Sequence, residues 1–559
     1  MKIRKRFTAI IERMRFWRGP KKELPASSRD SASAVLEDLT DDSVATETLS
    51  TVASAATDVD APDLPIHIRF EASLYHRLRD HLLKSQQDDE DFCFVFCNTV
   101  RTSNAIFVLP RKIVAFAGDD TAVSRSRARV RVSADLVNEA YSMALAEEFD
   151  TILDCHSHPF DQGQVAFSPI DDASERIHAP YVEQELSHAS VKLGKPPRKL
   201  LYLAIVFGPN TFAARHYNVK HGCFDPIAKV TVLSDPIQVF TSSSSGTPTA
   251  PPDSFDRQVR AFGKEGQFIL SRLKVVVVGA GGIGSIVTEA LARLGIAKMV
   301  VIDMDTVETT NLNRLQGATP DDVGRKKVSV VARQARAANP DVEVNEIDQD
   351  LFHPDIVDAI KDADCIIGGL DNAPARYFLN RLAAQYLIPL IDGGTGITKT
   401  EAGQAQLRCR TAVVMPGLTP CMCCSPIQYF EQRELVMAFA DARTRDQLEQ
   451  HGYIQAGEAP AAPAVYPLNL GVASLITTTF MALFTGVSPR YWTTTIDYSG
   501  LEHDQRIGLD MATNLEGPSD QCLICGCYLG EGDRESLASY FKAADDRELS
   551  LDLEPAHVT

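Results

Sequence analysis

The chain has 559 residues, of which 44% are hydrophobic, and this length exceeds what one hydrophobic core usually supports, so we expect two large domains. Its formal net charge of −18 argues against nucleic-acid binding over the whole surface, because phosphate contacts need a concentrated basic face. We find no apolar run approaching the roughly 18 to 20 residues that cross a bilayer and no signal-peptide core, so we expect a cytoplasmic protein.

Residues 1–62 are predicted to be a disordered tail. Residues 1–22 combine Lys and Arg with large apolar side chains, a pattern also compatible with a basic amphipathic helix that touches a membrane. The rest of the segment is rich in Ser, Thr, Ala and Asp. Such a composition buries too little apolar surface to fold, so we favour disorder over membrane contact.

Residues 63–238 are predicted to form a mixed α/β domain. Leu74, Leu78 and Leu82 recur at helical spacing, and a short apolar run over 92–96 indicates a strand. A helix over 133–148 and strands over 151–155 and 200–207 follow. The sequence therefore predicts helices packed against a sheet.

A cluster of metal-ligand residues follows the strand over 151–155. His156 and His158 are separated by one residue at a strand end, so both imidazoles can face one Zn²⁺. Asp171 can supply a third ligand, which leaves a position open for water. Glu90, favoured over its acidic neighbours because of its place before the strand over 92–96, is the predicted general base, and Ser168 the predicted oxyanion donor.

The run His-Ser-His-Pro, then Ser-x-x-Asp, with an upstream Glu, resembles the JAMM (JAB/MPN) metallo-isopeptidases. The spacer of eight residues between Pro159 and Ser168 is somewhat longer than usual. The resemblance implies a cytidine-deaminase-like fold and zinc-dependent cleavage of ubiquitin-like precursors or conjugates. Because some members of this family are metal-free scaffolds, a non-catalytic docking module is the alternative.

Residues 239–253 are predicted to be a linker, because the run of Ser, Thr and Pro has nothing to bury. Residues 254–545 show alternating strands and helices, which predict a Rossmann-like, doubly wound parallel sheet. Residues 546–559 are polar and are predicted to be a second disordered tail.

A glycine-rich turn follows the first strand of this second domain. Its glycines are Gly279, Gly281, Gly282 and Gly284. They precede a helix whose N-terminal amides can bind phosphate, and Asp303, after the next strand, can bind ribose. Taken alone, these features fit a dinucleotide site equally well.

The next segment contains Asp-x-Asp-x-Val, then Asn-Leu-x-Arg, then a Lys and Asp-Asn, and this pattern resembles the ThiF and ubiquitin-activating-enzyme superfamily. The resemblance implies ATP and Mg²⁺ as cofactors, with nucleotide contacts from Asp303, Asp305, Asn311, Arg314, Lys327 and Asp371. By this resemblance Asp371 holds Mg²⁺, Asn311, Arg314 and Lys327 contact phosphates, and Arg257 reaches a phosphate, commonly across a homodimer.

Two Cys-x-x-Cys pairs lie far apart in the sequence. Cys421, Cys424, Cys522 and Cys525 fit a structural tetrathiolate zinc site, with Cys423 and Cys527 as neighbours that could replace a ligand. Between Ser425 and Cys522 the sequence contains no Cys, although activating enzymes of this kind usually carry a thioester-forming Cys there. We therefore favour direct transfer of the adenylate over catalysis by Cys423 or Cys409.

Together these sites predict a fused processing and activating enzyme that acts on a ubiquitin-like protein with a C-terminal Gly tail. A separate conjugating enzyme and a homodimer are the expected partners. The main alternative converts the adenylate of a sulfur carrier to a thiocarboxylate.

Overall fold

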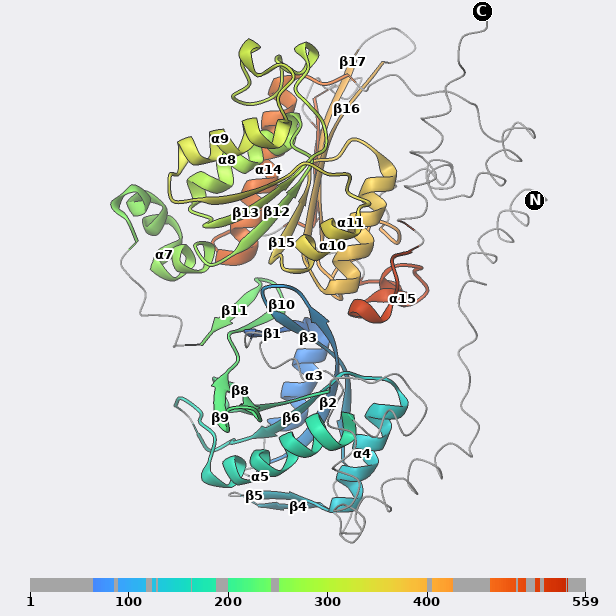
Figure 1. Ribbon diagram of the computed structural model, residues 1–559. Coiled ribbons are helices and arrows are strands. Elements are labelled where there is room, and N and C mark those ends of the chain that lie inside the picture. Colours follow the sequence, from blue (N-terminus) through green and yellow to red (C-terminus); the bar gives the residue numbers. More distant parts are fainter. Residues whose placement is uncertain are drawn as a thin grey trace, which may run out of the picture.

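The computed structural model describes residues 64–84, 89–116, 123–126, 129–161, 163–187, 200–242, 251–399, 405–425, 463–488, 491–498, 508–512, 517–538 and 540. Figure 1 shows two bodies, each built on one large sheet, which we call the N-terminal part (64–242) and the C-terminal part (251–540). The predicted tails, 1–62 and 546–559, lie outside the described residues.

The N-terminal part contains a nine-stranded mixed sheet with the order β11-β10-β1-β3-β2-β6-β7-β8-β9. The strands are β1 (Ile66–Glu71), β2 (Phe92–Arg101), β3 (Ile106–Ala115), β6 (Thr151–Ser157), β7 (Leu201–Phe207), β8 (Phe212–Asn218), β9 (Cys223–Pro226), β10 (Lys229–Leu233) and β11 (Gln238–Thr241). A separate ribbon pairs β4 (Val123–Ser126) with β5 (Arg129–Val132), and the helices are α3 (Ala72–Leu82), α4 (Ala134–Ala146), α5 (Pro169–Pro180) and a π-helical turn over Tyr181–Leu186.

The alternation of side chains along β2 separates the two faces of this sheet. Cys93 and Val95 pack in one apolar cluster with α3, whereas Phe92 and Phe94 pack in another with α4. His156 of β6 lies directly opposite Phe92, so it shares that second face. Since α5 also contributes to the second cluster, the register of β2 and β6 places the predicted histidines beside α5.

The C-terminal part contains an eight-stranded sheet with the order β14-β13-β12-β15-β16-β17-β18-β19. The strands are β12 (Lys274–Val278), β13 (Lys298–Ile302), β14 (Glu343–Ile347), β15 (Cys365–Gly368), β16 (Leu390–Lys399), β17 (Ala405–Val414), β18 (Thr493–Asp497) and β19 (Gly508–Ala512). The helices are α7 (Asp256–Leu270), α8 (Gly282–Leu294), α9 (Lys327–Ala338), α10 (Pro354–Lys361), α11 (Ala373–Tyr386), α14 (Tyr466–Thr485) and α15 (Cys525–Tyr528).

The first five strands of this order, β14 to β16, are parallel, and helices cover both faces of the sheet (Figure 1). The predicted Rossmann-like, doubly wound sheet is therefore confirmed. The direction of the strand order reverses between β12 and β15, and ligands of such sheets bind outside the carboxyl ends of the strands at this point. This edge is where the glycine-rich turn lies.

Two expectations from the sequence are wrong in detail. The predicted linker, 239–253, overlaps β11, which pairs with β10 through Thr241, and a 3₁₀ turn begins at Asp253. Short extended segments of this kind are hard to separate from loops by composition. We also expected no apolar run long enough to cross a bilayer. By length and composition α14 could do so, because its Thr and Asn side chains lower its hydropathy too little. In the fold, half of its apolar window is buried, and it packs against α8 and the sheet.

The two parts meet through buried polar contacts. Arg69 of β1 is 4% exposed, and its guanidinium donates hydrogen bonds to the carbonyls of Tyr386 (3.1 Å), Lys361 (3.0 Å) and Ala363 (2.8 Å). Lys229 of β10 pairs with Asp364 at 2.5 Å. Because an unpaired buried donor is costly, these contacts are specific to one docking arrangement.

Candidate functional site

The glycine-rich turn lets three backbone segments approach closely at the carboxyl edge of the sheet. Gly279 has a φ of +94°, and a Cβ there would lie 2.7 Å from the carbonyl oxygen of Gly369, beyond β15. A Cβ at Gly284 would lie 1.8 Å from the carbonyl oxygen of Gly279. Gly281, in contrast, has open space around it, so a ligand can approach the start of α8.

Asp303 lies just beyond β13 and is held beside this turn. Its carboxylate accepts hydrogen bonds from the backbone N–H groups of Ala280 (2.7 Å) and Asp305 (2.9 Å). Burial raises its pKa, and the nearby Lys327 acts in the opposite direction. The Lys327 ammonium lies 2.6 Å from the Asp305 carboxylate. The predicted residues Asp303, Asp305 and Lys327 are thus brought together.

Arg314, a predicted phosphate contact, follows the 3₁₀ turn over Thr309–Asn311. Asn311 is 7% exposed, and its side-chain oxygen accepts a hydrogen bond from the backbone N–H of Glu308 at 3.1 Å. The Arg314 guanidinium donates to the Thr310 carbonyl at 2.7 Å. A Cβ at Gly282 would lie 3.5 Å from Cγ of Arg314, so this arginine lies beside the N-terminus of α8.

The two remaining predicted nucleotide residues are exposed. Asp371 follows β15, and the next residue, Asn372, caps α11 by accepting a hydrogen bond from the backbone N–H of Ala375 at 2.9 Å. Arg257 lies near the start of α7. Within the part of the chain that the structure describes, neither side chain forms a hydrogen bond or ion pair. Asp371 is therefore at the carboxyl edge, whereas no contact joins Arg257 to this site.

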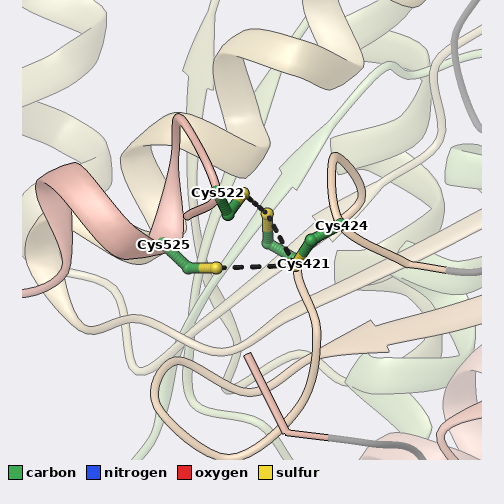
Figure 2. A group of neighbouring side chains, drawn as sticks. All are labelled: Cys421, Cys424, Cys522 and Cys525. Carbon is green, nitrogen blue, oxygen red and sulfur yellow. Dashed lines mark hydrogen bonds between the residues drawn. The ribbon is translucent and has the colours of Figure 1, made fainter. Parts of the chain in front are cut away.

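The four predicted zinc cysteines gather from segments about a hundred residues apart (Figure 2). The Sγ atoms of Cys421 and Cys522 are 3.5 Å apart, those of Cys424 and Cys525 are 3.5 Å apart, and those of Cys421 and Cys424 are 3.9 Å apart. A disulfide would need a separation of about 2 Å. Tetrahedral thiolates about 2.3 Å from Zn²⁺ lie about 3.8 Å from one another, so this donor set fits zinc.

Neighbouring cysteines lie outside this group. Cys423 is exposed, and its Sγ atom lies 3.5 Å from the side-chain nitrogen of Asn380. Cys409 is buried on β17, and burial raises its pKa, which disfavours the nucleophilic thiolate. Residues 426–462, which belong to the Cys-free stretch between Ser425 and Cys522, lie outside the described residues.

A second group of metal-ligand side chains lies in the N-terminal part. Ligand atoms of His156, His158 and Asp171 all lie within 4.8 Å of one another. Nε2 of His156 is 3.4 Å from Oδ1 of Asp171, and Nε2 of His158 is 3.8 Å from Oδ2. In a tetrahedral zinc site, nitrogen and oxygen ligands lie about 3.3 Å apart.

The protonation of this group depends on its carboxylates. Burial lowers the pKa of His156, but Asp154 and Asp171 together raise it to about 10. Nε2 of His156 is buried and forms no hydrogen bond with any described residue. Such a ring nitrogen is costly unless another group binds it, so the residues present fit a metal ion.

Glu90 is distinguished from its acidic neighbours by what it faces. It is 6% exposed, and its Oε1 lies 3.8 Å from Nε2 of His158. Burial raises the pKa of Glu90 to about 7, with Asp171 acting in the same direction. Asp91 instead pairs with Lys84 at 2.8 Å and Arg125 at 2.9 Å. Of these two acids, only Glu90 has the position of a general base for the histidine group.

Ser168 positions Asp171 at the start of α5. The backbone N–H of Ser168 donates to the Asp171 carboxylate at 2.6 Å, and Ser168 Oγ accepts from the backbone N–H of Asp171 at 3.4 Å. This reciprocal pair is a capping box. The oxyanion role of Ser168 stays a prediction.

Sequence reasoning missed one carboxylate in this group. Asp154 lies two residues before His156, and its Oδ1 is 3.9 Å from Nδ1 of that histidine. Its other oxygen accepts a hydrogen bond from the hydroxyl of Tyr202. Residues two apart on a strand share a face, so the spacing of Asp154 was the available signal.

Known proteins resemble the C-terminal part. Residues 255–523 match the ThiF family. The chain is 38% identical over 162 residues to the SAMP-activating enzyme E1 of Haloferax volcanii, which covers 29% of this chain and 56% of that protein. It is 34% identical over 164 residues to the sulfur carrier protein ThiS adenylyltransferase of Bacillus subtilis, and the match covers 29% of this chain and 46% of that protein. The chain thus spans about half the length of these curated relatives.

Two further likenesses have lower sequence identity. The ubiquitin-activating enzyme E1 1 of Candida albicans is 33% identical over 177 residues, covering 30% of this chain and 16% of that protein. A crystal structure of E. coli MccB with MccA-N7isoASN has a TM-score of 0.39 and 21% identity, and the match covers 50% of this chain and 76% of that chain. From the family match and the Rossmann-like sheet, the C-terminal part of this chain is a ThiF-family domain.

Proposed function

We propose that the C-terminal part activates the C-terminal carboxylate of a ubiquitin-like or sulfur carrier protein by ATP-dependent adenylation. The observation that carries this proposal is the grouping of Asp303, Lys327 and Arg314 around the start of α8. Two relatives, named as a SAMP-activating enzyme and a ThiS adenylyltransferase, support the same reaction class.

In the proposed reaction, a carboxylate oxygen of the carrier attacks the α-phosphorus of ATP, and pyrophosphate leaves. Mg²⁺, held by Asp371, would offset the phosphate charge. Arg314 and Lys327 would bring positive charge to the same phosphates, because the attack brings two anions together. Asp303 would bind the ribose while its oxygens also fix the backbone N–H groups of Ala280 and Asp305.

ATP–pyrophosphate exchange tests this proposal. With a panel of ubiquitin-like proteins that end in Gly, we expect exchange that depends on one of them. Asp371→Ala should reduce the exchange rate about a hundredfold or more. The matched control is Asp355→Ala, an exposed acid on α10. Absence of exchange with every carrier would contradict the proposal.

We propose in addition that the N-terminal part is a JAMM-type zinc isopeptidase that trims the carrier or releases it from conjugates. Zinc, held by His156, His158 and Asp171, would supply an acidified water molecule. Glu90 would take a proton from the attacking water and return it to the leaving amine.

Cleavage of a carrier fusion tests this second proposal. The substrate is the carrier that supports exchange, extended beyond its terminal Gly by a short peptide. His156→Ala should abolish cleavage, while His76→Ala, on the exposed face of α3, should leave it unchanged. Unchanged cleavage in His156→Ala would instead favour a non-catalytic docking module.

A second pathway shares the adenylate but converts it to a thiocarboxylate. Two relatives are named as sulfur carrier adenylyltransferases, and the sequence has no Cys between Ser425 and Cys522. Mass spectrometry of the carrier C-terminus distinguishes the outcomes, because a thiocarboxylate replaces one oxygen by sulfur, whereas conjugation forms an isopeptide. The conjugating enzyme, the homodimer that would bring Arg257 to a second site, and the cytoplasmic location stay predictions.

A further inference from the structure

An ion pair with a buried carboxylate contacts the loop that carries the proposed magnesium ligand and has no part in the roles assigned above. Asp392 of β16 is 1% exposed, and both of its carboxylate oxygens lack a hydrogen-bond partner among the described residues. Its only close cations in the described part of the chain are the guanidinium groups of Arg376, at 3.3 Å, and Arg410, at 3.9 Å. An ionised carboxylate is costly in this environment, so a folding role alone does not explain it.

The position of the pair links it to the loop after β15. Arg376 lies on α11, and its Nη2 donates a hydrogen bond of 2.6 Å to the carbonyl of Leu370. Leu370 directly precedes Asp371. A Cβ at Gly368, the last residue of β15, would lie 2.8 Å from Oδ1 of Asp392. The Arg376 guanidinium therefore bridges the loop after β15 and Asp392, near the start of β16.

We propose that Arg376 and Asp392 act as positioning residues that fix the Leu370–Asp371 backbone and thereby aim the Asp371 carboxylate at the nucleotide site. This inference rests on the proposed adenylation function. Asp392 attracts the guanidinium through the ion pair at 3.3 Å, and the guanidinium donates a hydrogen bond to the Leu370 carbonyl. Lysine in place of Arg376 keeps the charge, but it cannot hold both partners in one plane. Neither residue contacts the reacting atoms.

Asp392→Asn and Arg376→Lys, made in the full-length chain, test the proposal by ATP–pyrophosphate exchange with the active carrier. Because the pair acts on a metal ligand, we expect kcat to fall about ten- to a hundredfold. The Mg²⁺ concentration for half-maximal rate should rise, while KM for the carrier stays unchanged. The control is Arg408→Lys. Arg408 lies on the same face of β17 as Arg410, but its side chain is 55% exposed and pairs with Asp497.

A purely structural role predicts a different result. It would lower the melting temperature and reduce kcat in proportion to the unfolded fraction, with no change in Mg²⁺ dependence, and this outcome would overturn the inference. If one variant does not fold, the other gives the same reading. If the wild-type protein shows no exchange, the proposed function fails. The inference is then tested by Mg²⁺-dependent binding of AMPCPP to the wild-type protein and the same variants. Equal Mg²⁺ dependence in the variants and the wild type would overturn it.

Discussion

At the residue scale, neighbouring acids in one short segment have separate partners. Glu90 faces His158, whereas Asp91 forms ion pairs with Lys84 and Arg125 and accepts a hydrogen bond at its backbone carbonyl from Ser157. Burial alone would raise the pKa of Asp91, but Lys84 and Arg125 lower it, so Asp91 stays charged and paired. Burial raises the pKa of Glu90. Local packing therefore distinguishes these two acids, which composition alone does not.

Replacement of Glu90 tests this division directly. We expect Glu90→Gln to retain zinc and to lower kcat/KM for carrier cleavage about 10² to 10⁴-fold, because a general base is lost without loss of a ligand. Asp89→Asn, at an exposed position, is the matched control. Zinc content is measured on the same samples. Equal cleavage by the two variants would remove Glu90 from the proposed mechanism.

A partly buried histidine at the junction of the two parts predicts a pH dependence of stability. His67 lines a cavity of 470 Å³ between them, and burial, reinforced by Lys229, lowers its pKa to about 3. The folded protein therefore binds this proton less readily than the unfolded chain. Stability from this group is present above the unfolded pKa of about 6.5 and is lost as pH falls toward 3.

Because folding lowers the pKa of His67 from 6.5 to about 3, the free energy of unfolding should be about 2 kcal/mol lower at pH 5 than at pH 7.5. His67→Phe should remove this part of the acid sensitivity, measured as the difference in unfolding free energy between the two pH values. His76→Phe, at an exposed site on α3, serves as the control. The same pH difference in His67→Phe and wild-type protein would refute the assignment.

At the element scale, the sequence predicts what is local and periodic. Ser168 and Asp171 have capping-box spacing, and the glycines mark the turn before α8, so both elements were predictable. Long-range pairs were not. Arg376 and Asp392 lie on different elements, and nothing in the spacing of either residue indicates the other. The apolar run of α14 was also underestimated, since threonines interrupt it without adding charge.

The four-cysteine group joins two segments that lie about a hundred residues apart in the sequence. The segment after β17 supplies one pair of ligands and the segment that contains α15 supplies the other. We expect Cys522→Ser to lose one equivalent of zinc and at least about 3 kcal/mol of stability, because loss of a metal removes a crosslink. Cys527→Ser is the control. Metal analysis and thermal unfolding provide the measurements; unchanged zinc content would exclude the site.

At the scale of the whole molecule, the segment that follows α15 also contacts the N-terminal part. Asn98 of β2 donates to the carbonyl of Gly530 at 3.0 Å and accepts from Arg534 at 3.1 Å. Together with Arg69 and its three carbonyl partners, these contacts hold the two parts in one arrangement. The proposed hydrolytic and adenylating sites would therefore keep a fixed relation within one chain.

Arg69→Met tests this docking. Three carbonyls, two buried and one partly buried, lose a charged donor, so we expect a loss of about 3 kcal/mol in unfolding free energy. Hydrogen exchange should increase in β1 and at the end of α11. Arg77→Met, an exposed position on α3, should have no effect. Unfolding of Arg69→Met indistinguishable from wild type would show that the two parts do not depend on this contact.

The central claim is that one C-terminal carboxylate passes through the adenylating site of the ThiF-family domain. Intact-mass analysis of a Gly-ending carrier, incubated with this chain and MgATP and quenched at short times, tests it most directly. We predict a carrier species heavier by one AMP that is absent with Asp371→Ala and absent when the terminal Gly is removed. ATP consumption without any adenylated carrier, across the whole panel, would contradict the account.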